Sequence, residues 1–441
     1  MFPRDSEKGM GMAFKALSGV FAGTLAFLAA GEAMAQSRDN YFARDRNVSV
    51  TERDRPGYQA LGLPLGAFLL FPKIEVGVQG NDNIYSQGSH GASDLIGIAS
   101  PQIDLASQWS RNSLTAFVRS STRQYASHTS ENATDWQFGG TGQVDGGDTT
   151  FKAGGDYGFF AQPRWANIGE NSLAQFTTVR PVGDYQSAMN ADVIHTINRI
   201  QLEGQITYNA NSYLNGENAN GQVVHENQYD YDRTYLIGKV SYAVMPEASI
   251  YGAFSYNMLN YPNGDVLPGY SPNPNSTGET YDIGANFDLT HLIRGDVELG
   301  YLQQVFAGDK LSTITGFQAK GDVQYFPTQL ITLTLTGSRN VDASTIAGSP
   351  GTITGQLSGQ ADYELLRNLI LSAEAQWSGS SYEGLDRHDN VTELTASGQY
   401  LMNRNIGLHL AYDFLRQDST GTQHGVNFTE NRVTLTTVLQ Y

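Results

Sequence analysis

The sequence predicts an all-β protein: a transmembrane, antiparallel, up-and-down β-barrel of about 18 strands, with short turns at one end and long loops at the other. Three observations support this prediction. Polarity alternates residue by residue along most of the chain, two kinds of break separate the alternating segments, and an export leader is followed by no long apolar run. Only 16% of residues are charged, below the ~25% that is typical of soluble globular proteins.

Residues 1–35 have the features of a secretory signal peptide. Basic residues precede an apolar run at 16–30, and Ala33–Ala35 offers small residues for cleavage before Gln36. A retained membrane anchor is the alternative, but the apolar run is shorter than the ~20 residues that a spanning helix needs. We therefore expect export with cleavage of this leader.

Residues 36–67 differ in character from the rest of the chain. Arg and Asp are interleaved in this segment, which also holds Pro56 and Pro64. We expect an irregular periplasmic extension, which either hangs free as a disordered leader or folds into the lumen.

Residues 68–441 carry the strand pattern of the barrel. The stretch YDIGANFDLT, residues 281–290, places Tyr281 and Ile283 on one face and Asp282 and Asp288 on the other. In a soluble β-sandwich array, which is the alternative, the outward faces would carry Lys and Glu. Here one face of each segment is apolar with almost no charge, which lipid can accept, and the other is polar. The sheet must close, because an open edge in hydrocarbon leaves backbone groups unpaired.

Two kinds of break alternate between these segments. Long, polar, glycine-rich stretches alternate with tight turns, which are typical of hairpins. The tight turns lie near Arg111, Gly147, Asn198, Pro246, Arg294, Pro327, Arg367 and Asn403. Eight such turns, with one terminal strand beyond each end turn, imply roughly 18 strands and place both chain ends on the periplasmic side.

Aromatic residues are expected to form girdles at the two membrane interfaces, near the turns. The candidates are Tyr301, Tyr325, Tyr363, Trp377, Tyr400 and Tyr412. The chain ends in VTLTTVLQY, whose last aromatic residue, Tyr441, is the kind of signal that the barrel-assembly machinery reads. These features predict the outer membrane of a Gram-negative bacterium, with membrane lipid and lipopolysaccharide as surroundings.

The composition argues against several functional classes. A net charge of −17 argues against nucleic-acid binding, and the absence of Cys excludes thiolate metal sites and Cys nucleophiles. No His, Asp or Glu cluster has metal-ligand spacing, so we expect no metal or cofactor. A hydrolase would need a nucleophile beside a base, and only His409 among eight His lies mid-strand on a polar face. We expect no enzyme, and we interpret His409 as a wall residue.

Strand parity predicts which charged residues face the lumen. The acidic ones are Glu75, Asp104, Asp192, Glu203, Asp282, Asp288, Glu298, Asp322, Asp362, Glu374, Glu393 and Asp413. The basic ones are Lys73, Arg119, Arg123, Lys152, Arg233, Lys239 and Lys320, and His409 completes the set. The acidic excess predicts weak cation selectivity.

The junction RDRPGYQALGLPLGAFLLFPKIEVGVQGNDNIY, residues 53–85, resembles the putative β-barrel porin-2 family of outer-membrane proteins. The matching positions are Arg55, Pro56, Tyr58, Leu61, Gly62, Gly66, Phe68, Leu69, Leu70, Phe71, Pro72, Glu75, Val76, Gly77, Asp82, Asn83, Ile84 and Tyr85. The resemblance implies a channel. It also implies a part in exopolysaccharide or capsular polysaccharide export, together with periplasmic export components.

Three functional hypotheses follow: a polysaccharide conduit, a general diffusion porin for small hydrophilic solutes, and a structural or adhesive surface barrel. For a glycan, wall amides would supply hydrogen bonds and inward Tyr251 a stacking surface. The candidate amides are Gln102, Gln108, Gln205, Asn286, Gln318, Gln324, Gln356, Gln360 and Gln376.

Overall fold

The computed structural model describes residues 48–89, 91–162, 164, 178–227, 230–263, 275–289, 292–308, 313–343, 349 and 351–441. The predicted signal peptide and residues 36–47 lie outside the described residues. Within that part of the chain, no helix is long and apolar enough to cross a membrane.

Eighteen long strands form one antiparallel sheet that closes on itself. The first nine are β2 (Phe68–Asn81), β3 (Asp94–Ser107), β4 (Ser113–Tyr125), β5 (Ala133–Asp145), β6 (Thr149–Ala161), β7 (Gly183–Ile197), β8 (Ile200–Tyr213), β11 (Tyr231–Met245) and β12 (Ala248–Asn260). The others are β13 (Ser276–Leu289), β14 (Ile293–Phe306), β15 (Ile314–Thr328), β16 (Ile331–Ala343), β17 (Gly351–Leu366), β18 (Leu369–Tyr382), β19 (His388–Leu401), β20 (Ile406–Thr420) and β21 (Phe428–Gln440).

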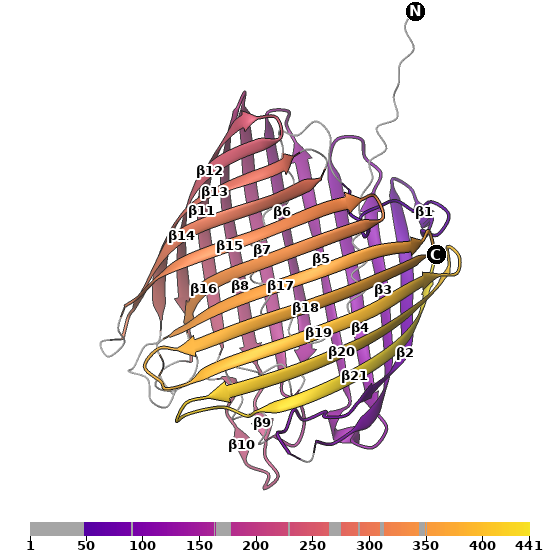
Figure 1. Cartoon of the computed structure of the whole chain (residues 1–441), viewed down its shortest axis with the longest axis vertical. Coiled ribbons are helices and arrows are strands. Elements are labelled where there is room, and N and C mark those ends of the chain that lie inside the picture. The colour runs from indigo at the N-terminus through magenta and orange to yellow at the C-terminus, as the bar shows by residue number, and fades with distance from the viewer. Residues whose placement is uncertain are drawn as a thin grey trace, which may run out of the picture.

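Pairing of the first long strand with the last one closes the barrel. β2 runs antiparallel to β21 from the pair Lys73–Gln440 to the pair Asn81–Arg432. Every other long strand pairs with its neighbours in the sequence, and the strands wind obliquely around the barrel (Figure 1). Closure leaves no long edge exposed to hydrocarbon. The predicted antiparallel barrel of about 18 strands is therefore confirmed.

The connections differ in length at the two ends of the barrel. Eight short turns span 108–112, 146–148, 198–199, 246–247, 290–292, 329–330, 367–368 and 402–405. The strands are joined at the other end by longer connections, such as 82–93, 162–182 and 261–275. Asn198 adopts φ +54° in a two-residue turn, a conformation that Asn tolerates better than most residues. Asymmetry of this kind is typical of outer-membrane barrels, with the short turns on the periplasmic side.

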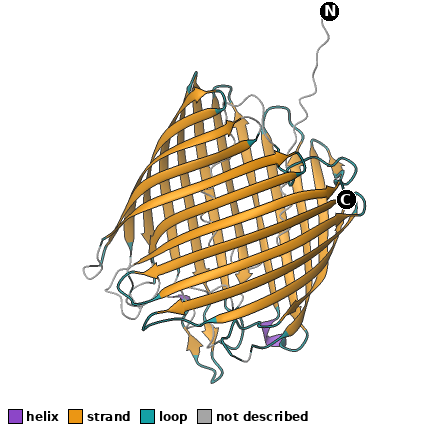
Figure 2. Cartoon of the chain, viewed as in Figure 1, coloured by secondary structure: helices purple, strands orange, loops and turns teal. Residues whose placement is uncertain are grey.

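Four minor elements complete the described chain. β1 (Leu63–Leu65) extends the sheet by pairing with the start of β2, near the C-terminus in Figure 1. At the opposite end, β9 (Gly216–Glu217) pairs with β10 (Val223–Val224) in a small hairpin. The 3₁₀ turn η1 (Thr129–Glu131) is drawn as a helix in Figure 2.

The two faces of the wall differ as the alternation predicts. Apolar residues point outward: Ile283 is 70% exposed in the isolated chain, which leaves it available to lipid. On the inner face, polar side chains pack against one another, so that Thr434 is 0% exposed. All six predicted girdle residues lie on the outer face, but Tyr301, Trp377 and Tyr412 lie well inside β14, β18 and β20 and not near a turn. The prediction that every one of the six flanks a turn was therefore wrong for these three.

Candidate pore wall

The strand register places all twenty predicted wall residues on the inner face, opposite the exposed apolar positions. They are Lys73 and Glu75 on β2, Asp104 on β3, Arg119 and Arg123 on β4, Lys152 on β6, Asp192 on β7, Glu203 on β8, Arg233 and Lys239 on β11, Asp282 and Asp288 on β13, Glu298 on β14, Lys320 and Asp322 on β15, Asp362 on β17, Glu374 on β18, Glu393 on β19, and His409 and Asp413 on β20. Their role in an open, conducting pore stays a prediction.

Several of these charges are paired on the wall. Lys73 Nζ lies 2.7 Å from Glu75 Oε1 on the same strand. Arg123 Nη2 contacts Asp135 Oδ2 of β5 at 3.0 Å, and the same guanidinium donates to the Ala161 carbonyl. Local pairing of this kind reduces the field that a passing ion meets.

A denser polar cluster spans β11 to β14. The Tyr251 hydroxyl lies 2.8 Å from Asp296 Oδ1 and 3.1 Å from Glu298 Oε2, so it donates to one carboxylate at a time. Lys239 Nζ lies 4.0 Å from the centroid of the Tyr251 ring, a cation–π distance. The lysine therefore offsets part of the negative charge that the two carboxylates place around the phenol.

Two inner-face glycines allow these side chains to lie flat against the wall. A Cβ atom at Gly284 would overlap the Tyr251 ring, and a Cβ atom at Gly300 would overlap the Asp282 carboxylate. Because both positions lack a side chain, the Tyr251 ring crosses β13 to reach β14. Asp282 likewise crosses β14, where its Oδ1 accepts a hydrogen bond at 2.7 Å from Gln318 Nε2 of β15.

This arrangement corrects part of the glycan hypothesis. Tyr251 is only 5% exposed, so its ring offers no stacking surface to a sugar. Gln108 follows β3 in a periplasmic turn and does not belong to the wall. Other predicted amides are engaged with carboxylates: Gln102 Nε2 donates to Asp104 at 2.7 Å, and Gln360 Nε2 to Asp362 at 3.0 Å.

The charges are distributed unevenly around the barrel. Six of the seven predicted basic wall residues lie on β2 to β11, and Lys320 of β15 is the seventh. Eight of the twelve predicted acidic residues lie on β13 to β20. The two halves of the wall therefore differ in charge, and the second half is the more acidic.

Several inner-face charges were absent from the sequence-based set. They are Asp135 on β5, Arg294 and Asp296 on β14, and Glu430 and Arg432 on β21. Arg294 had been assigned to a tight turn, but β14 already begins at Ile293. Residues two and four positions before Glu298 point to the same face of the strand, so the alternation could have identified Asp296 and Arg294.

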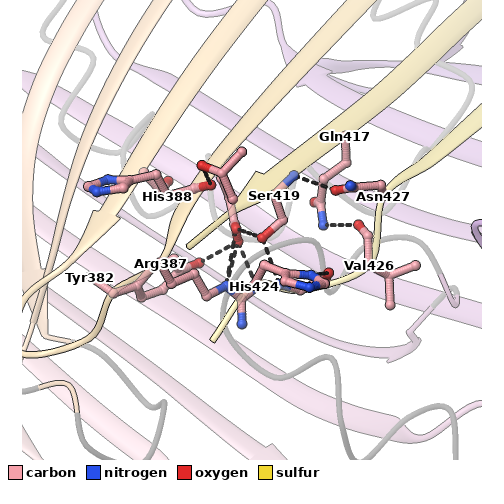
Figure 3. Close-up of polar contacts among 12 residues, drawn as sticks. Tyr382, Arg387, His388, Gln417, Ser419, His424, Val426 and Asn427 are labelled. Atoms are coloured by element: carbon pink, nitrogen blue, oxygen red, sulfur yellow. Dashed lines mark hydrogen bonds and ion pairs between the residues drawn. The ribbon is translucent and has the colours of Figure 1, made fainter. Parts of the chain in front are cut away.

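The loop end of the wall is held by polar contacts, shown in Figure 3. Asp389 accepts hydrogen bonds from Arg387 Nε at 3.0 Å, from the Tyr382 hydroxyl at 3.2 Å and from Ser419 Oγ. Gln417 Nε2 donates to the Val426 carbonyl at 2.9 Å. Gln417 thus attaches the loop 421–427 to β20, and Asp389 of β19 joins β20 to Tyr382 of β18.

This cluster brings Ser, His and Asp into one region without the geometry of a hydrolase. Ser419 Oγ donates directly to Asp389, and His424 Nδ1 lies 2.8 Å from the Gly425 carbonyl. The serine is therefore not activated by an imidazole base, as nucleophilic catalysis requires. The contacts are those of a loop anchor.

Comparison with solved structures gives distant matches. OccAB3 of Acinetobacter baumannii is 10% identical, with 86% of this chain and 100% of that chain covered and a TM-score of 0.47. OccK2 (OpdF) of Pseudomonas aeruginosa, solved in complex with glucuronate, is 12% identical, with 85% and 99% covered and a TM-score of 0.45. None of the curated proteins compared with the chain matches it.

The family comparison covers the whole barrel. One family model, described as "Putative beta-barrel porin 2", matches residues 55–441, from the predicted junction to the last residue. The match includes all eighteen long strands. The protein is an outer-membrane β-barrel of the porin type, and the chain belongs to the family described as "Putative beta-barrel porin 2".

Proposed function

We propose that the barrel is a passive diffusion channel for small hydrophilic solutes, with a weak preference for cations. The supporting observation is the inner wall itself. A barrel of this strand count is wider than its own side chains fill, and its inner face carries an excess of carboxylates. Charged groups along a pore wall set ion preference, because they raise the local concentration of counter-ions.

The acidic half of the wall is the part that favours cations. Asp362, Glu374 and Asp413 accept hydrogen bonds from the neighbouring hydroxyls of Ser372, Ser358 and Thr395 at 2.6, 2.6 and 2.9 Å. Neutral hydroxyl partners leave the negative charge of a carboxylate in place. Glu374 and Asp413, which are partly exposed, are therefore available to attract cations across this side of the lumen, and Asp362, which is 3% exposed, adds its charge to theirs.

Planar-bilayer recording tests this proposal. The purified full-length protein is inserted between two KCl solutions of unequal concentration, and the reversal potential is measured. We expect a reversal potential of the sign that denotes modest cation preference, together with swelling of protein-containing liposomes in small sugars. Anion preference would contradict the ion selectivity, and absence of both current and swelling would contradict the diffusion function.

Export of a polysaccharide, which the family resemblance implies, is the second candidate. One structural feature favours it: two neighbouring rows of uncharged polar residues cross β16 to β18. They are Ser338, Gln356 and Ser378, and Thr336, Ser358 and Gln376. Such groups can exchange hydrogen bonds with water for hydrogen bonds with sugar hydroxyls. Export would also require periplasmic partners that deliver the polymer.

Deletion of the gene separates the two candidates. Loss of secreted or surface glycan, restored by the plasmid-borne gene, would favour export. Normal glycan together with reduced uptake of small solutes would favour diffusion. Normal glycan and uptake with impaired surface attachment would favour the structural or adhesive alternative.

A further inference from the structure

The N-terminal segment that precedes the barrel is attached to the inner wall near its periplasmic end. We call residues 48–58 the N-terminal latch. The backbone N–H of Val50 donates to Thr332 Oγ1 at 2.9 Å, and the two residues are 0% and 1% exposed. Thr332 is the second residue of β16 and faces the lumen, so this contact lies inside the mouth of the barrel.

A buried ion pair forms the second attachment. Arg294 Nη2, on the inner face of β14, contacts Glu52 Oε2 at 2.8 Å. Arg294 is 1% exposed, and its Nε also donates to Gln324 Oε1 of β15 at 3.0 Å. Burial alone would raise the pKa of Glu52, but Arg294 and the hydrogen bonds from Ser49 lower it below its ordinary value, so this carboxylate is held ionised.

A shared carboxylate forms the third attachment. Glu364, near the periplasmic end of β17, accepts from Arg53 Nη1 at 2.9 Å and from Arg55 Nη2 at 3.2 Å. Arg55 Nη2 also donates to the Val50 carbonyl at 2.7 Å, a hydrogen bond within the latch itself. Glu364 is 5% exposed and the Arg55 side chain 10%, so this pair is largely shielded from water, whereas the Arg53 side chain is 28% exposed.

Beyond these attachments the segment continues to the seam of the barrel. Arg404, in the turn between β19 and β20, donates to the Pro56 carbonyl at 3.1 Å. Gln440, at the end of β21, donates to the Tyr58 carbonyl at 3.5 Å. The latch therefore runs from β14–β17 along the periplasmic rim to β21, after which β1 and β2 begin.

We propose that the N-terminal latch is a releasable constriction of the periplasmic mouth, held closed by the contacts of Glu52, Arg53 and Arg55 with Arg294 and Glu364. Charge complementarity supports this proposal, because three of the four charged residues of the latch, Glu52, Arg53 and Arg55, meet an opposite charge on the wall. Residues 48–58 form no strand pairing with the barrel. The segment can therefore leave the wall without breaking any backbone hydrogen bond of the sheet. The proposal has two readouts, cysteine labelling and ionic current. It rests on the proposed function only for the second, because a current requires a conducting channel.

Cysteine labelling tests release directly, because the native chain has no Cys. Thr332→Cys places one thiol beneath the latch. Thr336→Cys places a matched thiol on the same strand and the same face, where Thr336 is exposed. With the native latch, we expect Cys at 332 to be protected from a water-soluble maleimide and Cys at 336 to react.

The triple variant E52Q/R53Q/R55Q removes the three latch charges that meet the wall and leaves the wall unchanged. We expect loss of protection at 332 in this background, whereas Asp54→Asn, an exposed change in the same segment, preserves protection. Reaction at 332 with the native latch would overturn the proposal. Continued protection in the triple variant would overturn it as well.

Single-channel recording of the same variants tests the constriction. We expect a higher conductance for the triple variant than for the native protein, and native conductance for Asp54→Asn. Equal conductance of the native and triple-variant channels, despite loss of protection at 332, would overturn the constriction. If no variant conducts although labelling responds, the diffusion function fails, while exposure of position 332 still demonstrates a releasable latch.

Discussion

Single residues without side chains determine how the wall is lined. At Gly284 the Tyr251 ring occupies the space that a Cβ atom would fill, so the ring lies against the sheet and not across the lumen. The phenol then reaches Asp296 and Glu298, two strands away. Gly284 thus keeps the Tyr251 ring out of the lumen and allows its hydroxyl to reach the two carboxylates.

We therefore expect Gly284→Ala to destabilise the barrel by ~1–3 kcal/mol, the usual range for an overpacked site. The added methyl group must displace the Tyr251 ring and break its hydrogen bonds. Urea unfolding in detergent, followed by the heat-modifiable gel mobility of the folded barrel, measures the change. Gly407→Ala is the control, because a Cβ atom there meets only ordinary contacts. Equal unfolding midpoints for the two variants would contradict this interpretation.

Glu226, in the loop between β10 and β11, is a buried acid at the loop end of the molecule. It is 4% exposed, and its Oε1 has no hydrogen-bond partner among the described residues. Burial raises the pKa of Glu226 to about 7. The folded loop therefore favours the protonated carboxyl.

The sign of the pH effect follows from the raised pKa. The stabilising contribution of protonated Glu226 is fully present below the ordinary pKa near 4.5 and is lost as pH rises through about 7. We expect weaker hydrogen-exchange protection of residues 214–227 at pH 8 than at pH 6, after correction for intrinsic rates. Glu226→Gln should abolish this difference, and Glu217→Gln, at an exposed position of the same loop, should retain it. An unchanged pH response in Glu226→Gln would refute the assignment.

At the scale of elements, the seam between β2 and β21 depends on a buried carboxylate. Glu430 is 0% exposed and accepts from Asn81 Nδ2 at 2.8 Å and from Ser86 Oγ at 3.0 Å. Below it, Gln79 Nε2 donates to Thr434 Oγ1 at 2.9 Å. Side chains thus reinforce the backbone pairing of two strands whose residues lie more than 340 positions apart in the sequence.

Glu430→Ala should weaken this seam, because the buried donors of Asn81 and Ser86 lose their acceptor. An unsatisfied buried donor costs about 1–3 kcal/mol, so we expect a lower free energy of unfolding in urea. Glu383→Ala, at an exposed position of the loop between β18 and β19, should leave it near the native value. If Glu430→Ala is as stable as the control, the seam is held by the backbone alone.

At the scale of the whole molecule, the asymmetric distribution of charge is the property most relevant to transport. Most predicted basic wall residues lie on β2 to β11, and most acidic ones on β13 to β20. A difference in charge between two sides of an aqueous lumen creates a transverse field, which a passing ion or dipole meets along its path. Under the proposed diffusion function, we expect the acidic excess to set the sign of the net ion preference.

Neutralising part of the acidic half should shift selectivity toward anions. We expect the triple variant D362N/E374Q/D413N to move the KCl-gradient reversal potential in the anion direction, with each side chain keeping its size. The control D418N/E279Q/E383Q removes the same charge from Asp418 and Glu279, on the outer face, and from Glu383, in a loop. Equal shifts in the two variants would mean that overall charge, and not the wall, sets selectivity.

The fold and most of the inner-face assignments were predictable, because both follow from a two-residue period. Asp282 and Ile283 are neighbours on one strand and therefore point to opposite faces of the sheet. Every register that directs the apolar face toward lipid directs Asp282 toward the lumen. Positions at strand ends were harder: Arg294 was assigned to a turn, and Gln108 to the wall, because polarity does not mark where a strand begins or ends. The burial of Tyr251 was also missed, since it depends on Gly284 of the next strand.

Alternation of polarity and the lengths of the breaks between strands determined, from the sequence alone, that this chain forms a closed barrel of about 18 strands with a polar inner wall. Each of these properties is local, because neighbouring residues along a strand must point to opposite faces. Only the tertiary structure decided the route of the N-terminal latch and the pairing of wall charges. Val50 meets Thr332, 282 positions away, and Arg53 meets Glu364, 311 positions away. Closure of the barrel creates such contacts, and no periodicity in the sequence encodes them.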